Sequence, residues 1–355
     1  MKVVDLFAGV GGLSHGFLME NFEIVFAIEF DKDIALANQY NHSNTVVYNI
    51  DITQADIQAL YKKYSDIDVI IGGPPCQGFS QKGKRLSLND ERNFLFKHFI
   101  KFVEKFRPKY FLLENVPNII TTSNGFFKDE IVNAFNDIGY SIDYNILNAS
   151  EFSVPQNRKR AFFLGKLGKD KLKLPKPNPN HLKISIKDAI YDLPFITSGE
   201  GQEISNYDKK YFSKYQKTLR NKSKILYNHK ATNHSKIALE RLSLIPKNGG
   251  RNSLPKEHLT KSVFSGTWTR LKEDGIAATI TTRFDTPSSG LFTHPVLNRC
   301  LTVREAARIQ SFPDSFRFYG NKTSQMKQVG NAVPPLLAKA IAAVIKKDIN
   351  NESIT

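Results

Sequence analysis

The chain is poor in sulfur and in long apolar runs. Its 355 residues include two cysteines and three methionines, and the two cysteines, Cys76 and Cys300, are too few for a disulfide framework. No apolar run approaches the roughly 20 residues that cross a bilayer, and no signal-peptide pattern precedes the strand-like segment Val3–Phe7. We therefore expect a cytoplasmic protein of a reducing compartment, with no membrane partner.

Acidic residues are also scarce, because 34 Asp and Glu stand against 50 Lys and Arg, a net charge of +16. The excess is concentrated in residues 166–274, which carry 23 basic and 10 acidic residues, whereas residues 1–165 carry 17 and 19. Lysines in Lys209–Lys236 alternate with aromatic residues such as Tyr211 and Phe212. Lysines that bind phosphates release counterions and supply affinity for any sequence. This segregation favours a nucleic-acid face over a merely solvated surface.

The first 165 residues alternate strand-like and helix-like segments, which predicts βαβ units and a parallel sheet covered on both faces. The strands are expected at Val3–Phe7, Ile24–Ile28, Thr45–Tyr48, Val69–Ile71, Tyr110–Leu113 and Ala161–Leu164. The helices are expected at Ile34–Tyr40, Ile57–Tyr64, Phe94–Phe106 and Phe127–Ile138. The fold class is therefore α/β.

Beyond Lys166 the periodicity fades, and Pro175–Asn180 reads as a turn-rich linker. Helical spacing returns at Val303–Gln310 and Pro335–Lys346, and the last helix is expected to pack on the first domain. We expect a first domain at residues 1–185, completed by 326–355, and a second domain at 186–325.

The run Gly72–Ser80 holds a cysteine that is flanked by two prolines and three glycines. The prolines fix φ, and the glycines permit tight turns and the close approach of another molecule. Because the run follows a predicted buried strand, Cys76 is expected on a loop where open α/β sheets bind ligands. Such a cysteine is either an attacking thiolate or a small buried side chain.

A second loop, Asp5–Gly12, joins a predicted strand to a glycine-rich turn that opens a helix. Its spacing departs from G-x-G-x-x-G, so a dinucleotide site, a methyl-donor site and a purely structural turn all stay open. Glu29, at the end of the second predicted strand, can accept hydrogen bonds from two ribose hydroxyls. Asp51, which closes the third, suits an adenine amino group. For both carboxylates a helix-capping role is the alternative.

Several motifs together make the chain resemble the C5-cytosine DNA methyltransferase family of bacterial restriction–modification systems. They appear in the family's order. The residues that carry the resemblance are Asp5–Gly12, Glu29, Asp51, Gly72–Ser80, Glu114–Val116, Gln156–Arg160, Arg304–Phe316 and Gln328–Pro334. Residues from about 185 to 275 lie outside the motifs.

The resemblance implies a Rossmann-like, S-adenosylmethionine-dependent methyltransferase domain and a second, smaller, mostly irregular or β target-recognition domain. It also implies sequence-specific transfer of a methyl group from S-adenosyl-L-methionine to C5 of a flipped cytosine in duplex DNA, leaving S-adenosyl-L-homocysteine and using no metal. We expect a monomeric modification enzyme that associates with the nucleoid through DNA. Whether a cognate restriction endonuclease, acting separately, accompanies it stays open.

The resemblance assigns the chemistry to four residues. Cys76 adds to C6 of the base, so that C5 can attack the donor methyl group. Glu114, protonated, holds N3 and the exocyclic amine, and Arg160 donates to O2. Arg158 helps to position the loop or the thiolate.

The resemblance also implies binding residues. The expected cofactor contacts are Phe7, Ala8, Gly9, Gly11, Gly12, Glu29, Phe30, Asp51, Ile52, Pro75, Leu95 and Asn331. The expected DNA contacts are Gln77, Ser80, Arg270, Thr281 and Arg283.

Two other functions remain open from the sequence: a tRNA cytosine methyltransferase of related fold, and a catalytically inactive binding module. The large basic middle region favours duplex DNA over tRNA. A nicotinamide dehydrogenase is disfavoured by the glycine spacing.

Overall fold

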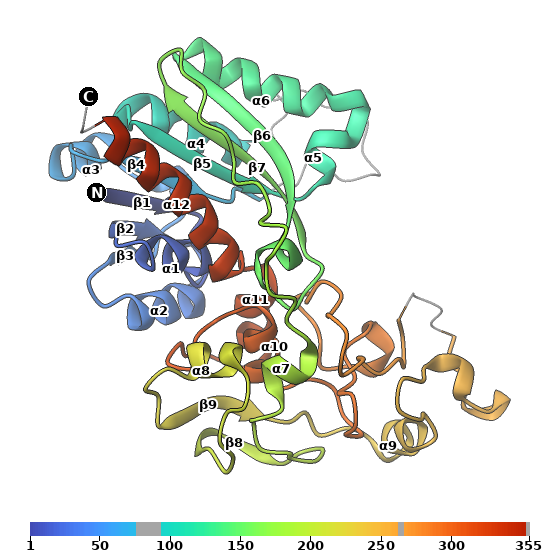
Figure 1. The fold of residues 1–355 in the computed structure, drawn as a ribbon. Helices are drawn as coiled ribbons and strands as arrows, with labels where there is room; N and C mark the ends of the chain where they lie inside the picture. The colour runs from blue at the N-terminus through green and yellow to red at the C-terminus, as the bar shows by residue number, and fades with distance from the viewer. Residues whose placement is uncertain (76–93, 262–265, 353–355) are drawn as a thin grey trace. The chain divides into compact units, whose positions relative to one another are not determined.

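The computed structural model describes residues 1–75, 94–261 and 266–352, which fold into two compact units (Figure 1). Unit 1 comprises Met1–Asn148, Lys159–Asn178 and Pro335–Thr355, and unit 2 comprises Ala149–Arg158 and Pro179–Pro334. The sequence-based division differs at three places: it assigned the short segment Ala149–Arg158, residues 179–185 and residues 326–334 to the first domain.

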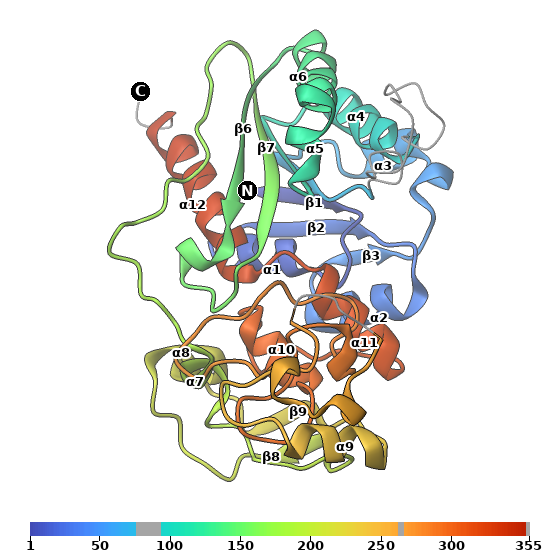
Figure 2. The ribbon, with the colours of Figure 1, turned by 90° about the vertical axis from the view of Figure 1, so that its right-hand side faces the viewer.

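Unit 1 is built on a seven-stranded sheet of order β3-β2-β1-β4-β5-β7-β6 (Figure 2). Its strands are β1 (Lys2–Leu6), β2 (Glu23–Ile28), β3 (Val46–Tyr48), β4 (Val69–Gly72), β5 (Tyr110–Asn115), β6 (Tyr140–Asn148) and β7 (Lys159–Leu167). The six predicted strands are confirmed, whereas β6, which carries polar residues at alternate positions, was not predicted.

The alternation of strands and helices predicted a parallel sheet, but two strand pairs of the sheet are antiparallel. β7 runs antiparallel to both β5 and β6, while the pairs among β1 to β5 are parallel. β6 follows β7 in the sheet and precedes it in the chain, so the two strands form a long hairpin-like pair. β7 begins at Lys159, so Arg158 precedes the strand and does not share a strand face with Arg160.

Helices pack on this sheet. The helices of unit 1 are α1 (Gly12–Leu18), α2 (Lys32–Asn41), α3 (Ile57–Lys63), α4 (Phe94–Phe106), α5 (Asn118–Thr121), α6 (Phe126–Asp137) and α12 (Pro335–Glu352). One large apolar cluster fills the space between helices and sheet, with the rings of Phe111 and Phe135 stacked at 4.0 Å.

α12 returns to unit 1, as expected, and packs on α1. A Cβ added at Gly16 of α1 would lie 2.3 Å from the Cβ of Ala338, so the two helices touch closely there. In the described part of the chain, one helical stretch, Lys322–Glu352, has the length and hydropathy of a membrane span, but 61% of that window is buried inside the protein. The packing of α12 on α1 identifies it as a core helix.

Unit 2 has short elements joined by long irregular segments. They are α7 (Ile186–Ile190), β8 (Gly201–Asn206), α8 (Lys214–Arg220), β9 (Ile225–Lys230), α9 (Lys236–Ser243), α10 (Val303–Ile309) and α11 (Lys322–Asn331). β8 and β9 form a separate two-stranded antiparallel sheet. The sequence predicted α10 alone among these helices.

Candidate active site at the carboxyl edge of the unit 1 sheet

Four parallel strands end at one edge of the unit 1 sheet. β1 lies between β2 and β4, and β5 lies beyond β4, so their last residues Leu6, Ile28, Gly72 and Asn115 share that edge. Ligands of open α/β sheets bind at the carboxyl ends of strands where the strand order reverses. The predicted motifs Asp5–Gly12, Glu29, Gly72–Pro75 and Glu114–Asn115 all lie at these ends.

The turn after β1 is sharp. Phe7, Gly9 and Gly11 have φ values of 59°, 55° and 89°, a region that glycine enters without steric cost. A Cβ added at Gly11 would lie 2.3 Å from His42 Cε1, whereas one added at Gly9 would meet no atom within 4 Å. The turn is therefore packed on one side and open on the side where a ligand would lie.

Glu29 fixes the open side of this turn. Its Oε2 accepts a hydrogen bond from the Gly9 amide at 2.8 Å, and its Oε1 accepts one from the Asp31 amide at 2.8 Å. Burial raises the pKa of the Glu29 carboxyl, and the two amides oppose that shift. Each oxygen keeps a further lone pair, so the same carboxylate can bind ribose hydroxyls while it holds the turn.

The packed side of the turn depends on two residues that the sequence analysis missed, Asn38 of α2 and His42, which caps the carboxyl end of that helix. Asn38, fully buried, donates from Nδ2 to the Gly9 carbonyl at 2.9 Å, and its Oδ1 lies 2.8 Å from His42 Nδ1. Burial lowers the pKa of His42 to about 3, so the ring is neutral. The signal in the sequence was a polar residue four positions after Ile34, on the apolar face of the helix.

Beneath the turn, Asp5 of β1 accepts a hydrogen bond from Ser14 Oγ of α1 at 2.5 Å. Asp5 is 1% exposed. Burial, with a smaller contribution from Glu29, raises the pKa of the Asp5 carboxyl to about 7, against the opposing effect of the Ser14 hydrogen bond. A carboxyl that titrates near neutrality therefore lies directly below the predicted cofactor turn.

The other predicted cofactor contacts of unit 1 vary in exposure. Phe30 is 73% exposed and Ile52 only 4%. Asp51 caps the 3₁₀ turn Ile52–Gln54 by accepting from the Thr53 amide, which is the capping alternative that the sequence left open, and its second carboxylate oxygen is not used in that cap. Leu95, in the first turn of α4, is half-buried against the apolar cluster.

The chain after β4 is held by β5. Asn115 Nδ2 donates to the Pro74 carbonyl at 3.0 Å, and Pro75 is exposed. A Cβ added at Gly73 would lie 2.8 Å from Glu114 Oε2, so only glycine leaves room for that carboxylate. The predicted nucleophile Cys76 and the predicted DNA contacts Gln77 and Ser80 lie outside the described residues.

Glu114 and Arg160 form an ion pair at the same edge. Arg160 Nε lies 3.0 Å from Glu114 Oε1, and the two side chains are 16% and 13% exposed. The pair bridges neighbouring antiparallel strands, because β5 ends and β7 begins at this edge. Arg160 also donates from a terminal nitrogen to the Lys159 carbonyl at 2.8 Å. A carboxylate and a guanidinium are thus placed together beside Gly73–Pro75, as the sequence predicted.

The remaining predicted residues belong to unit 2. Arg158 is fully buried and donates to the carbonyls of Ile280 and Gly330 at 3.0 and 2.7 Å. Asn331 ends α11. Thr281 and Arg283 are exposed.

Arg270 differs from the exposed position that a DNA contact implies. It is 4% exposed, and its guanidinium donates to the carbonyls of Ile245, Leu242 and Leu297 at 2.8 to 2.9 Å. The side chain therefore ties loops of unit 2 together. The local sequence, a run of Thr, Trp and Arg before a charged turn, does not show whether the arginine is buried or exposed.

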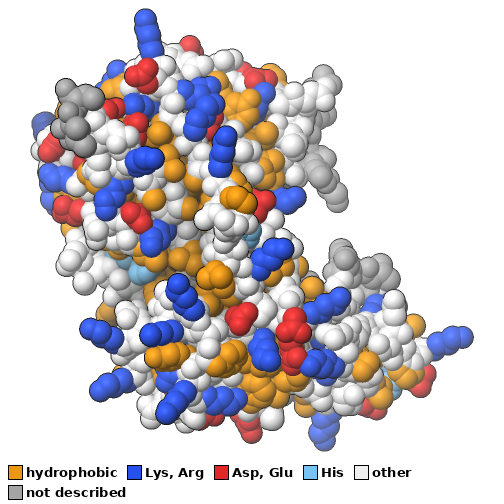
Figure 3. All heavy atoms as spheres, viewed as in Figure 1, with side chains coloured by type: hydrophobic (Ala, Val, Ile, Leu, Met, Phe, Trp, Pro, Cys, Tyr) orange, Lys and Arg blue, Asp and Glu red, His pale blue; other side chains and the backbone are white. Residues whose placement is uncertain are grey.

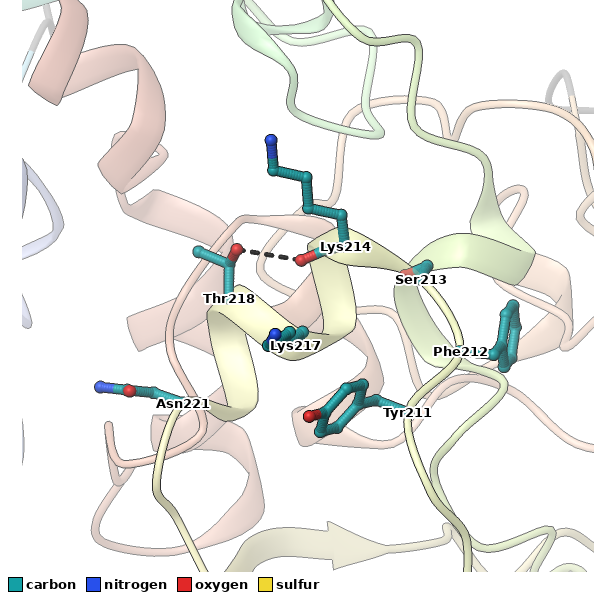
Figure 4. Close-up of a pocket in the computed structure, with 7 residues that line it drawn as sticks. All are labelled: Tyr211, Phe212, Ser213, Lys214, Lys217, Thr218 and Asn221. Atoms are coloured by element: carbon teal, nitrogen blue, oxygen red, sulfur yellow. Dashed lines mark hydrogen bonds between the residues drawn. The ribbon is translucent and has the colours of Figure 1, made fainter.

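A basic surface of unit 2 surrounds α8. An open hollow of about 820 Å³ is lined by Tyr211, Phe212, Ser213, Lys214, Lys217, Thr218 and Asn221 (Figure 4). Lys and Arg side chains gather over the part of unit 2 where Figure 1 places α8 (Figure 3). Lys214 and Lys217 are exposed, and neither forms an ion pair with any residue that the structure describes. None of the predicted site residues lines this hollow.

No three His, Cys, Asp or Glu side chains cluster as a metal site within residues 1–75, 94–261 and 266–352.

Comparison with known proteins agrees with the geometry. Residues 1–347 match the family model of the C-5 cytosine-specific DNA methylases. The chain is 39% identical to the type II methyltransferase M.DdeI of Desulfomicrobium norvegicum, over 96% of this chain and 88% of that protein. It is 36% identical to the type II methyltransferase M1.HphI of Haemophilus parahaemolyticus, over 99% and 88%.

Solved structures show the same fold. One, described as a DNA modification methyltransferase encoded within a prophage of E. coli, superposes with a TM-score of 0.80 at 29% identity, covering 99% of both chains. The Dnmt2 methyltransferase of S. pombe superposes with a TM-score of 0.65 at 16% identity, covering 99% of both, a likeness of fold alone.

Proposed function

The chain belongs to the C-5 cytosine-specific DNA methylase family, and from this premise we propose which of its residues carry out the methyl transfer. The protein is a cytosine-5 DNA methyltransferase, an enzyme whose substrate is DNA, and its family uses S-adenosylmethionine as methyl donor. The observation that carries the assignment is the Glu114–Arg160 pair, 3.0 Å apart, at the same sheet edge as the glycine turn.

The turn fits an S-adenosyl ligand. The open space beside Gly9 admits a ligand against the backbone, and the Glu29 carboxylate lies at that opening with lone pairs for ribose hydroxyls. Asp51, Ile52, Phe30 and Leu95 are proposed to surround the adenine. When bound, S-adenosylmethionine supplies an electrophilic methyl group on a sulfonium.

Glu114 and Arg160 are proposed to hold the target base. Glu114 accepts from the exocyclic amine of cytosine and, protonated, donates to N3. Arg160 donates to O2, where negative charge develops once a nucleophile adds at C6. The ion pair holds both side chains at the edge before the base arrives, so little reorganisation is needed on binding.

Cys76 is proposed as the nucleophile. Its thiolate adds to C6, the C5–C6 double bond supplies the electron pair that takes the methyl group at C5, and loss of the C5 proton expels the thiolate and restores the ring. A cytosine in a duplex must first leave the helix, at a cost of a few kcal/mol. Phosphate contacts from the basic middle region offset that cost.

The test measures transfer of labelled methyl groups from S-adenosylmethionine to duplex DNA, with bisulfite sequencing to locate the modified cytosines. Replacing Cys76 with Ser should abolish transfer, because an alcohol is a far weaker nucleophile than a thiolate, while DNA binding stays intact. The wild-type chain should form a covalent complex with DNA containing 5-fluorocytosine. Methyl transfer at the normal rate by C76S would remove Cys76 from the mechanism.

Two further proposals concern partners. Since the relatives M.DdeI and M1.HphI are named type II methyltransferases, we propose that this chain modifies the recognition site of a restriction system. We also propose that it acts as a monomer. Resistance of DNA from expressing cells to a panel of endonucleases tests the first proposal, and light scattering with DNA bound tests the second. A tRNA substrate arm in the methyl-transfer assay should remain at background.

A further inference from the structure

Arg158 lies where it holds a loop of unit 2, and that loop carries two exposed polar side chains. Its guanidinium donates to the Ile280 carbonyl at 3.0 Å and to the Gly330 carbonyl at 2.7 Å. Arg158 is fully buried, so both bonds form away from water, where a charge-assisted hydrogen bond is strongest. One side chain therefore fixes residue 280 relative to the end of α11.

Gln156 holds the same loop by binding the backbone amide of Ile280, whereas Arg158 binds its carbonyl. Its Oε1 accepts from the Ile280 amide at 2.7 Å, and its Nε2 donates to Gln310 Oε1 at 2.8 Å. Gln310 in turn donates to the Val329 carbonyl at 2.7 Å. Both the amide and the carbonyl of Ile280 are thus bound by buried side chains of one short segment, Gln156–Arg158.

Gly330 clamps the loop on its opposite side. A Cβ added at Gly330 would lie 2.2 Å from the Thr281 carbonyl oxygen and 2.7 Å from the Thr282 amide nitrogen. The backbone of residues 281–282 therefore packs directly against the α carbon of Gly330. A substitution at either Arg158 or Gly330 must displace the same turn.

The turn so held presents its side chains outward. Ile280 is fully buried, whereas Thr281 and Arg283 are exposed, Arg283 by 69% of its side chain. Thr281 Oγ1 donates to the Arg283 carbonyl at 2.8 Å, which closes the turn locally. An exposed hydroxyl and guanidinium on a backbone fixed from three directions have the geometry of a preorganised contact to phosphate or to a base edge.

We propose that Arg158 and Gln156 are positioning residues for a DNA-contacting turn, Thr281–Arg283, and that Arg158 acts through this turn. This replaces the role beside the thiolate that the family resemblance implied for Arg158. The inference rests on DNA being the substrate and on the proposed methyl transfer as its readout. The turn binds DNA in the Michaelis complex, so its displacement raises the KM for DNA and leaves kcat nearly unchanged.

The first experiment compares Arg158→Lys, Gly330→Ala and the control Gly275→Ala in steady-state methyl transfer. Lysine keeps the charge but cannot hold two carbonyls with a planar fork. The KM for DNA should rise about tenfold in R158K and G330A, the size expected for one lost charge-assisted hydrogen bond. Gly275→Ala adds a Cβ 3.1 Å from Lys272 Cβ, also in unit 2, and should behave as wild type.

The second experiment is a double-mutant cycle. Thr281→Ala with Arg283→Gln removes the outward groups of the turn, together with the local bond from Thr281 Oγ1, and leaves the bonds of Arg158 and Gln156 to the Ile280 backbone. In that background R158K should change the KM for DNA by less than about twofold, because its effect passes through groups already removed. Full additivity of the two changes would overturn the inference.

A third measurement separates a role at the thiolate. If Arg158 acted on Cys76, R158K would slow covalent capture by 5-fluorocytosine DNA at saturating DNA and would leave KM unchanged, which also overturns the inference. Absence of methyl transfer by the wild-type chain would instead contradict the proposed function. Should R158K fail to fold by circular dichroism, Thr279→Val provides the milder test, since Thr279 Oγ1 donates to the Asn157 carbonyl at 2.7 Å. It should raise the KM about threefold.

Discussion

The two units bury different kinds of side chain. Unit 1 is filled by phenylalanines such as Phe99, Phe111 and Phe135. Among the residues that the structure describes, the four largest fully buried side chains are instead arginines, all in unit 2: Arg158, Arg299, Arg304 and Arg308. A sheet satisfies its own amides and carbonyls, so its faces can be apolar. Irregular chain cannot, and its buried carbonyls need donors from side chains.

Arg304 shows how this works in unit 2. Its Nε donates to the Tyr227 carbonyl at 2.9 Å, and its terminal nitrogens donate to the carbonyls of Pro313 and Phe316. Arg308 binds two carboxylates: its guanidinium donates to Asp192 and Asp314 at 2.5 to 3.2 Å. Each guanidinium joins segments far apart in the chain and replaces the strand pairing that the region lacks.

The largest expected effect breaks this arrangement in unit 2. Arg308→Met keeps much of the shape but leaves Asp192 and Asp314 buried without their cation, so the free energy of unfolding should fall by about 3–5 kcal/mol. Trp268, the single tryptophan, is buried in unit 2, and its fluorescence during urea unfolding follows that unit. Arg283→Met, at an exposed position, serves as the control. An unchanged midpoint for R308M would show that buried arginines do not stabilise unit 2.

A buried acid in unit 1 sharpens the comparison. Asp5 has a hydroxyl partner and a pKa raised by burial to about 7, whereas the guanidinium of Arg299 helps to lower the pKa of Glu305 in unit 2 against the effect of burial. The folded state therefore keeps a proton on Asp5 that the unfolded chain loses above pH 4. Stability falls as the pH rises toward 7 and is level above it.

Asp5→Asn should remove this fall, which amounts to about 3 kcal/mol between pH 5 and 8. Urea unfolding at four pH values, followed by far-ultraviolet circular dichroism, measures it. Ser14→Ala is the contrasting variant: it leaves the titrating carboxyl but removes the hydrogen bond that lowers its pKa, so the fall in stability should remain and extend to higher pH. An equal pH dependence in wild type and D5N would assign the titration elsewhere.

The smallest expected effect is on DNA affinity and concerns two exposed lysines of unit 2. Replacing Lys214 and Lys217 with Gln removes two cations beside the α8 hollow. If both contact phosphates, the slope of log K against log salt for duplex DNA should weaken by about 2, with about tenfold lower affinity at low salt. Lys62→Gln with Lys101→Gln makes the same charge change on α3 and α4 of unit 1. Equal slopes for the two pairs would remove α8 from the DNA interface.

The sequence predicted unit 1 better than unit 2 for the same physical reason. Buried strands such as Val69–Gly72 appear as apolar runs, and amphipathic helices such as Phe94–Phe106 show their period. β6 escaped because its exposed residues interrupt the pattern. In unit 2 the elements are short, and their order depends on arginines whose partners lie tens of residues away, which no local pattern reveals.

The candidate site divides in a similar way. Motifs at strand ends located Glu29, Glu114 and Arg160, because strand ends of a parallel sheet share one edge. Asn38 was missed, since its partner at Gly9 lies 29 residues earlier in the chain. The same limit applies to Arg158, whose carbonyl partners lie 122 and 172 residues away.

The direction of β7 has a consequence for how the Gln156–Arg160 segment can change. On the parallel strands β1 to β5 the site residues lie at or just after the last residue of the strand. On the antiparallel strand β7, Arg160 lies near the first residue. Successive side chains of a strand point to opposite faces, and Lys159 is exposed while Arg160 meets Glu114. Loss or gain of one residue ahead of Arg160 would turn lysine toward the carboxylate and arginine toward solvent. A change of length in this segment would therefore misplace Arg160 even if every residue type were kept.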